Sequence, residues 1–315
     1  MTPPAAETAS TTAPGVTATP GARPTVRSWR RLFTFDNRFL APILITLILV
    51  VANWQYSNLD NLSSPFLAWL TGGYVTTFSP TFAAILSALA MEMLLGRTLK
   101  GRWPLLASAY ISGISAGILI KSPFVWPYVL CAMISITSKY ALRVRGRHLW
   151  NPTNFGVTAM LFLAPATVGP LNVQSGNNLL PVVIIWVAGA LILGRLGRLH
   201  IPLCFAVAYV PLAYLRCQIT GHPFLTELAP LTSPMYQLFM CFMITDPPTT
   251  PRAKWAQCLV AVLVAIAECV LRLPQIEDIY APFHALFIVG PIANLIEIAI
   301  NARRQRAARS AVAVA

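Results

Sequence analysis

Long runs of apolar residues, separated by short polar stretches, recur from about residue 40 to residue 300. Several runs reach the roughly 18 to 20 residues that a helix needs to cross about 30 Å of hydrocarbon. The pattern predicts ten helices, over residues 40–57, 75–96, 104–120, 124–142, 153–168, 178–194, 200–215, 232–246, 254–272 and 280–300. We therefore expect an all-α, polytopic membrane protein, because in lipid each helix satisfies its own backbone hydrogen bonds.

The composition agrees with this fold class. Of the 315 residues, 56% are hydrophobic and 10% are charged, whereas soluble domains carry about 25% charged residues. The six cysteines lie mostly inside apolar runs and show no C-x-x-C spacing. We interpret them as small buried apolar residues, and we predict no metal site.

The two ends of the chain differ from its apolar middle. Residues 1–38 comprise an Ala/Thr/Pro-rich tail, expected to be disordered, and a basic aromatic segment expected to lie along the headgroup region. Residues 301–315 form a basic tail. We divide the middle into a first five-helix repeat (39–168), an outside linker (169–177) and a second five-helix repeat (178–300).

The net charge of +13 follows from where the basic residues fall. Short cytoplasmic segments of membrane proteins carry an excess of Lys and Arg. With both termini in the cytoplasm, 20 basic residues fall inside, and three, Lys121, Arg216 and Arg272, fall outside. The charge thus indicates that both termini face the cytoplasm, with the lipid bilayer as partner, and requires no nucleic acid. The Ala/Thr/Pro-rich and Arg-rich tails suit a bacterial chain, so we expect the bacterial cytoplasmic membrane.

A short pattern recurs at the ends of the third and eighth predicted helices. It reads Ile, polar, polar, Pro, first at residues 120–123 and again at residues 244–247. In both places the next helix but one opens at a proline, Pro152 or Pro282. In the assigned topology the two copies are antiparallel, as in inverted-repeat transporters. Backbone groups freed by such broken helices must line a cavity or be buried in protein.

The stretch RGRHLWNPTNFG, residues 145–156, opens the fifth predicted helix. Asn151 is a natural N-cap, Pro152 suits the first helical position, and Gly156 allows another backbone to approach. One interpretation is an anion or cofactor site, because the helix start presents free N–H groups beside arginines and His148. The other is a capped helix beside a basic loop.

The stretch TDPPTTP, residues 245–251, closes the eighth predicted helix. A carboxylate at a helix C-terminus is disfavoured by the helix dipole unless a donor meets it. Arg252, Lys254 or an arginine of the 143–147 loop is expected to pair with Asp246, or a ligand supplies the donor. Alternatively, Asp246 only forms a turn, since Asp before Pro commonly does so.

Three glutamates lie within or near predicted spans, where an ionisable group is a functional candidate. The basic residues expected to pair with them are Arg97 for Glu92, Arg272 for Glu268 and Arg303 for Glu297. Glu268 lies deepest. Its alternative interpretation is a proton or cation site.

NPTNFGVTAMLF and FMCFMITDPPTTPRAKW resemble two motifs of one family of redox-complex membrane proteins, the RnfD/NqrB family. Its members are the RnfD component of the Rnf electron-transport complex and the NqrB component of the sodium-pumping NADH:quinone reductase, and the resemblance covers about residues 40–300 in order and spacing. The matching positions, which are the candidate cofactor-binding residues, are Asn151, Pro152, Asn154, Gly156, Thr245, Asp246, Pro247 and Thr250.

The resemblance implies ten helices in two inverted halves and a flavin, FMN or riboflavin. It also implies that the chain passes electrons together with other membrane or soluble redox subunits, in complexes that couple redox reactions to Na⁺ or H⁺ movement. No catalytic residue is predicted.

One departure concerns flavin attachment. The family links FMN to a threonine in an S-G-A-T stretch, but the corresponding loop here, GPLNVQSGNNLLP, has Asn177 and Asn178 in place of Ala and Thr. We therefore expect no covalent attachment. A member with such a loop is similar to the UnbU-like membrane proteins of enediyne biosynthetic gene clusters. Two alternatives remain open on the same fold, transport of a small molecule or ion, and a role as membrane partner in an enediyne-type pathway.

Overall fold

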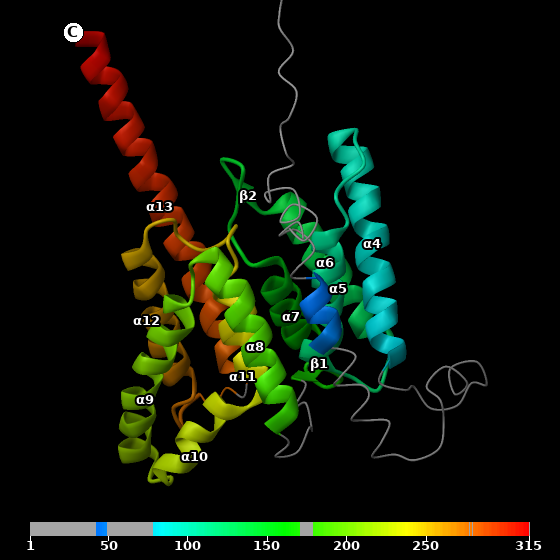
Figure 1. Cartoon of the computed structure of the whole chain (residues 1–315), viewed down its shortest axis with the longest axis vertical. Helices are drawn as coiled ribbons and strands as arrows, with labels where there is room; N and C mark the ends of the chain where they lie inside the picture. The colour runs from blue at the N-terminus through cyan, green and yellow to red at the C-terminus, as the bar shows by residue number, and fades with distance from the viewer. Residues whose placement is uncertain (1–41, 49–77, 171–178, 277, 279, 315) are drawn as a thin grey trace, which may run out of the picture. The chain divides into compact units, whose positions relative to one another are not determined.

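The computed structural model describes residues 42–48, 78–170, 179–276, 278 and 280–314. These residues belong to one compact unit, residues 37–315, and most of them are helical (Figure 1). The helices are α4 (Phe78–Lys100), α5 (Ala107–Leu119), α6 (Trp126–Ala141), α7 (Pro152–Leu163), α8 (Leu179–Leu196), α9 (His200–Thr220), α10 (Phe224–Leu228), α11 (Pro234–Leu238), α12 (Lys254–Leu271) and α13 (Ala281–Val314). Each predicted helix from residue 75 onward overlaps one of them. Residues 42–48 of the first predicted helix are helical, and its remainder lies outside the described residues.

Within the part of the chain that the structure describes, four helical segments are long and apolar enough to cross a membrane. They are Pro80–Lys100, His200–Thr220, Lys254–Leu271 and Ala281–Ser310. Large apolar side chains on them stay exposed, among them Leu86, Val207, Leu263 and Ile292. Continuous apolar surface of this kind needs a non-aqueous neighbour, and a lipid bilayer provides one.

Two of the helices that are shorter than predicted end just before a proline. The helices α5, with 13 residues, and α7, with 12 residues, are only about 20 and 18 Å long at 1.5 Å per residue. Pro123 and Pro165 follow their ends within a few residues and prevent the α conformation just before them. The predicted spans 104–120 and 153–168 therefore contain broken helices that are too short for about 30 Å of hydrocarbon.

The last helix, α13, is longer than predicted. It has 34 residues, so it extends about 51 Å and does not end at residue 300. Pro291 lies inside it and lacks the N–H that would bond to Phe287. The indole N–H of Trp150 donates to this free Phe287 carbonyl oxygen at 2.9 Å. The side chain of a loop residue thus satisfies the backbone carbonyl group that Pro291 leaves without an N–H donor in α13.

The helices pack in two series within the unit. The first series places α4 against α5 and α6, and α6 against α7. The second places α9 against α12 and α12 against α13, and α13 also contacts α7 (Figure 1). A Cβ atom at Gly156 in α7 would lie 2.6 Å from the carbonyl oxygen of Cys131 in α6. The expected close backbone approach at Gly156 is therefore confirmed.

The described residues also form four two-residue strands. β1 (Ile120–Lys121) pairs antiparallel with β4 (Gly169–Pro170), and β2 (Arg143–Val144) pairs antiparallel with β3 (Arg147–His148). The turn of the β2–β3 hairpin contains Arg145 and Gly146, both with positive φ, as a type I′ turn requires. This hairpin fixes the positions of Arg147 and His148 just before α7.

Candidate functional site

The segment before Asp246 is not a regular α-helix. Ser233 accepts a hydrogen bond from the Tyr236 N–H and so caps α11. The chain then widens into a π-helical turn, Phe239–Met243, in which the Ile244 N–H donates to the Phe239 oxygen at 3.2 Å. Pro247 and Pro248 prevent further helix. Single π turns of this kind frequently occur at functional sites.

Asn151 joins the two sequence motifs. Its side-chain oxygen accepts from the Asn154 N–H at 3.0 Å, and Pro152 occupies the first position of α7, so the predicted N-cap is confirmed. Its amide nitrogen donates to the Met243 carbonyl oxygen at 3.3 Å. One side chain therefore holds the start of α7 against the end of the π turn.

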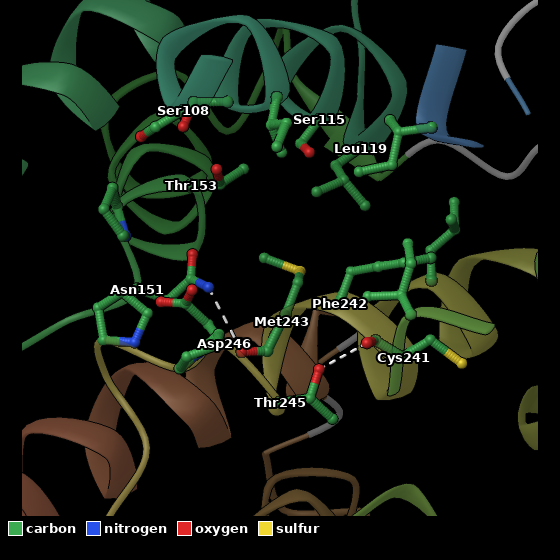
Figure 2. A pocket seen from close by; sticks show the side chains of 18 of the residues that line it. Ser108, Ser115, Leu119, Asn151, Thr153, Cys241, Phe242, Met243, Thr245 and Asp246 are labelled. Carbon is green, nitrogen blue, oxygen red and sulfur yellow. Dashed lines mark hydrogen bonds between the residues drawn. The ribbon is translucent and has the colours of Figure 1, made fainter. Parts of the chain in front are cut away.

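A cavity of about 400 Å³ lies where these two segments meet (Figure 2). Five of the eight candidate residues line it, namely Asn151, Pro152, Thr245, Asp246 and Pro247. Figure 2 shows Ser108, Ser115 and Thr153 on one side of the open space, with Asn151 and Asp246 on the other. The remaining wall is mainly apolar and includes Ile45, Ile111, Leu193, Leu238, Phe242 and Met243. An apolar cavity with a few convergent polar groups is typical of a small-molecule site.

Hydroxyl groups line the cavity, and that of Ser108 accepts a hydrogen bond from Lys139 at 3.0 Å. Ser108, Ser112 and Ser115 lie along one face of α5, and all three line the cavity. Ser112 is 7% exposed and Thr153 is 8% exposed. Within the described ranges, neither of these two hydroxyls is hydrogen-bonded to protein. Buried hydroxyl groups normally have a partner, so water or a ligand is expected to supply it.

His148 is one of the residues that line the cavity. Burial, together with the positive charges of Arg143 and Lys139, lowers its pKa to about 4, so the imidazole is neutral at pH 7. Arg143 donates to its Nε2 at 3.1 Å, which leaves the proton on Nδ1. Among the described residues, this buried Nδ1 has no hydrogen-bond partner. The N–H group is thus an unpaired donor beside the cavity.

The predicted basic partners of Asp246 are wrong. Its carboxylate accepts from the Thr249 hydroxyl at 2.7 Å, and the nearby positive charge is Arg198. Burial raises the pKa of Asp246 to about 6, although Thr249 and Arg198 oppose that rise. Its carbonyl oxygen also accepts the N–H groups of Thr249 and Thr250, at 3.2 and 3.1 Å. Asp246 thus forms the expected turn and lines the cavity as well.

Three candidate residues lie away from the cavity lining. The Asn154 amide donates to the Phe283 oxygen at 3.1 Å, and Gly156 contacts α6. The Thr250 hydroxyl donates to the Ile244 oxygen at 3.1 Å. These three residues hold the cavity walls in place.

The expected partners of Glu92 and Glu297 are also wrong. Glu92 pairs with Lys139 at 2.7 Å, because Arg97 lies too far along α4 to share its face. Glu297 pairs with Arg147 and accepts the Arg252 N–H at 2.9 Å. Both partners come from other segments of the chain.

Asn294 in α13 bonds to the two loops beside the cavity. It is fully buried, and its amide donates to the Leu149 oxygen at 2.9 Å and to the Thr249 oxygen at 2.8 Å. Arg147 adds a bond to the Thr250 oxygen at 3.2 Å. The loops before α7 and before α12 are thereby fixed to α13. An asparagine inside an apolar helix is the only sequence signal for this role.

A comparison with models of known protein families finds no match for the chain, and a comparison with curated protein sequences finds none either.

Proposed function

We propose that the chain is a membrane component of an electron-transport complex, of the RnfD kind, and that its cavity binds FMN or riboflavin without a covalent link. One observation carries this proposal. The two motifs behind the family resemblance, which lie 92 residues apart at their point of contact, line the same cavity.

The cavity residues fit a flavin. The volume of about 400 Å³ lies within the range of roughly 300–1,000 Å³ for small-molecule sites. The apolar side chains of Ile111, Leu193 and Phe242 would contact a planar ring. The serine and threonine hydroxyls and the Asp246 carboxyl would meet its polar edge. A bound flavin would supply one- and two-electron transfer, while these residues bind it, orient it and exclude water.

We also propose ten spans in two inverted repeats. Three loops that carry basic residues predicted to be cytoplasmic meet beside the cavity. Arg147 of the first loop bonds to the Thr250 oxygen of the second, and Arg198 of the third donates to the Thr245 oxygen at 3.3 Å. Arg216 and Arg272, both predicted to be outside, lie close together in another cluster. The broken helix α5 and the broken segment α11–π turn, which carry the recurring Ile-polar-polar-Pro pattern, both line the cavity.

A second candidate function is transport of a small molecule, including an intermediate of an enediyne-type pathway. The row of α5 hydroxyls supports it, because these groups would bind a polar solute between two broken helices. Both candidates use the same cavity and differ in what it holds.

Purification of the full chain in detergent, followed by absorbance and fluorescence spectra, tests the flavin proposal. We expect a flavin spectrum that is lost from the protein on acid precipitation. A flavin that stays with the precipitate would contradict non-covalent binding. A colourless protein that also fails to bind added FMN or riboflavin would reject the flavin and favour transport.

A further inference from the structure

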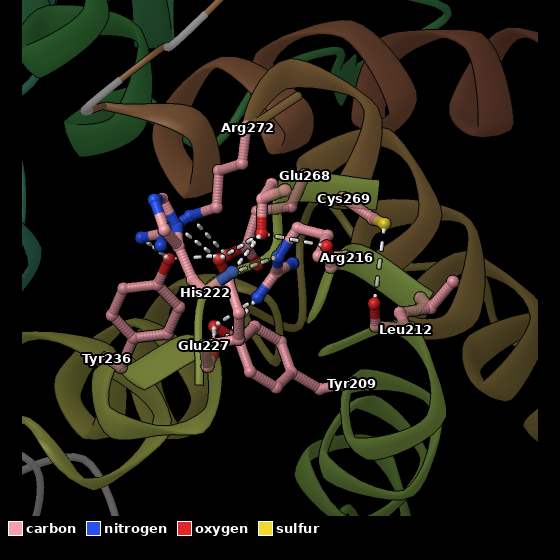
Figure 3. Close-up of polar contacts among 10 residues, drawn as sticks. Tyr209, Leu212, Arg216, His222, Glu227, Tyr236, Glu268, Cys269 and Arg272 are labelled. Atoms are coloured by element: carbon pink, nitrogen blue, oxygen red, sulfur yellow. Dashed lines mark hydrogen bonds and ion pairs between the residues drawn. The ribbon is translucent and has the colours of Figure 1, made fainter. Parts of the chain in front are cut away.

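A second group of buried charges lies toward the other end of α9 and α12 (Figure 3). The polar and ionisable groups of this cluster are Tyr209 and Arg216 from α9, His222 after α9, Glu227 from α10, Tyr236 from α11, Glu268 and Cys269 from α12, and Arg272 at its end. The flavin proposal does not use any of them. Two carboxylates and two guanidinium groups balance one another in charge.

Glu227 is completely bonded within this cluster. Its Oε2 accepts from Arg216 Nε at 2.8 Å, and its Oε1 accepts from the Thr220 hydroxyl at 3.3 Å and contacts His222 Nδ1 at 3.1 Å. Burial on its own raises the pKa of Glu227, but the hydrogen bonds from Arg216 and His222 outweigh it, so the pKa is lowered. Glu227 is therefore a permanently ionised partner of Arg216.

Glu268 is different, because only one of its oxygens is bonded. It is 0% exposed. Its Oε1 accepts from the Tyr236 hydroxyl and lies 3.2 Å from Arg272 Nε, so the predicted pairing with Arg272 is confirmed. Its Oε2 has no hydrogen-bond partner among the described residues, and neither has Arg216 Nη1. An unbonded charged oxygen in this position is costly.

We propose that Glu268 is a reversible proton-binding site. The two guanidinium groups favour its ionised form, whereas complete burial and the unbonded Oε2 favour its neutral form. A proton on Oε2 removes the uncompensated charge from that oxygen and leaves the bonds at Oε1 in place. Tyr236 and Arg272 thus position the carboxyl group in both protonation states.

The same surroundings select H⁺ over Na⁺. A hard cation needs several oxygen ligands, and both oxygens of Glu227 are already bonded to Arg216, His222 and Thr220. The positive charges of Arg216 and Arg272 act directly on Glu268 and would repel a metal ion. A proton on Glu268, in contrast, needs no further oxygen ligands.

The proton reaches the cluster from the side of His222, whose side chain is 64% exposed. His222 contacts Glu227, and Arg216 bonds to both Glu227 and the Tyr209 hydroxyl, the latter at 3.0 Å. An arginine does not release its protons, and Glu227 stays ionised. The proton therefore passes from His222 to Glu268 through water, and the unbonded Arg216 Nη1 is the group that would hold that water molecule.

Carbodiimide labelling of the full-length protein in detergent, read by peptide mass spectrometry, tests this proposal. The reagent modifies protonated buried carboxyl groups. We expect modification of Glu268 to rise at least several-fold as the pH falls from 8 to 6, with Glu227 unmodified and NaCl without effect. If Glu268 stays unmodified at every pH, it is a permanent ion-pair partner. If Na⁺ at fixed ionic strength protects Glu268 from modification, the cluster is a cation site. Either result overturns the proposal.

Infrared difference spectra across the same pH range provide a second measurement. The carbonyl band of a protonated carboxyl group should appear on acidification, disappear in Glu268→Gln and persist in Glu227→Gln. A band that persists in Glu268→Gln contradicts the proposal. Should Glu268→Gln fail to fold, the labelling of wild-type protein decides. Neither measurement depends on whether a flavin is bound.

Discussion

The side-chain amide of Asn151 donates a hydrogen bond to the main-chain oxygen of Met243 at 3.3 Å. This bond links the N-terminus of one broken helix to the C-terminus of another. The cavity lies beside it, with Asn151 and Met243 both in its wall. The shape of the cavity therefore depends on Asn151, whose side-chain oxygen also caps α7.

Two substitutions of Asn151 separate capping from the link to Met243. Asn151→Asp keeps an oxygen for the Asn154 N–H but removes the donor to Met243, whereas Asn151→Ala removes both. We expect Asn151→Ala to cost about 1–2 kcal/mol of stability through the lost cap, and Asn151→Asp to cost less. Both should weaken binding of added riboflavin. Thermal unfolding in detergent and a riboflavin titration measure the two effects. Wild-type binding by both variants would remove Asn151 from the site.

The half-buried Asp246 carboxyl predicts a pH effect of defined sign. Its pKa is raised from 3.8 to about 6 in the folded protein, so between these pH values the folded chain holds a proton that the unfolded chain has released. Its contribution to stability is thus present below about pH 4 and is lost as the pH rises through about 6. Asp246→Asn stays neutral throughout. The melting temperature of the variant relative to wild type should therefore rise with pH across this interval. A constant difference would show that the carboxyl is not buried as described.

Asp246→Asn also tests the site directly. We expect it to reduce flavin retention by several-fold, because the carboxyl lines the cavity. Glu297→Gln is the matched comparison, since Glu297 holds the loops through Arg147 and does not line the cavity. Retention of flavin during size-exclusion chromatography measures the difference. Equal retention by both variants would argue against contact between Asp246 and the ligand.

Gly156 and Gly194 form a matched pair of helical glycines. A Cβ atom at Gly156 would lie 2.6 Å from the Cys131 oxygen, whereas one at Gly194 would lie 3.8 Å from Leu199 Cδ1. Gly156→Ala should therefore cost about 1–3 kcal/mol through overpacking. Gly194→Ala should be neutral or slightly stabilising because alanine favours helix. Similar melting temperatures for the two variants would contradict the close contact between α6 and α7.

Asn294→Ala tests the attachment of the loops to α13. It leaves the part-buried main-chain oxygens of Leu149 and Thr249 without their donor, and the loss of a hydrogen bond costs about 1 kcal/mol for each. The control is Asn301→Ala on the same helix, because the Asn301 side chain makes no hydrogen bond to another described residue. We expect a clear loss of thermal stability only in Asn294→Ala. An equal effect of the two would show that Asn294 does not hold the loops.

The sequence predicts the local features well and the long-range partners poorly. The Asn151 cap and Pro152 at the first position of α7 depend on adjacent residues, so a short pattern is sufficient. The partners of Glu92, Asp246 and Glu297 come from segments far along the chain, as in the pairing of Arg147 with Glu297. Helix packing decides those contacts. Helix packing also places Ser112 in the lining of the same cavity as the TDPP turn. The sequence of α5 alone does not indicate which distant segment its serines meet.

Helix ends were predicted with mixed success for a physical reason. Prolines 123 and 165 stop α5 and α7 earlier than the apolar runs indicate. The opposite holds for α13, where Pro291 is tolerated because Trp150 bonds to the carbonyl it frees. The loop with Asn177, on which the expectation of non-covalent flavin depends, lies outside the described residues.

The most direct test of the account is a riboflavin fluorescence titration of wild-type protein and of Ser112→Phe in detergent. Ser112 is buried in the cavity wall, so a phenyl ring there would fill the space that a ligand needs. The account predicts saturable quenching with wild type and its loss with Ser112→Phe, at similar melting temperatures. Equal binding by the two proteins would contradict the claim that the meeting point of the two motifs is the ligand site.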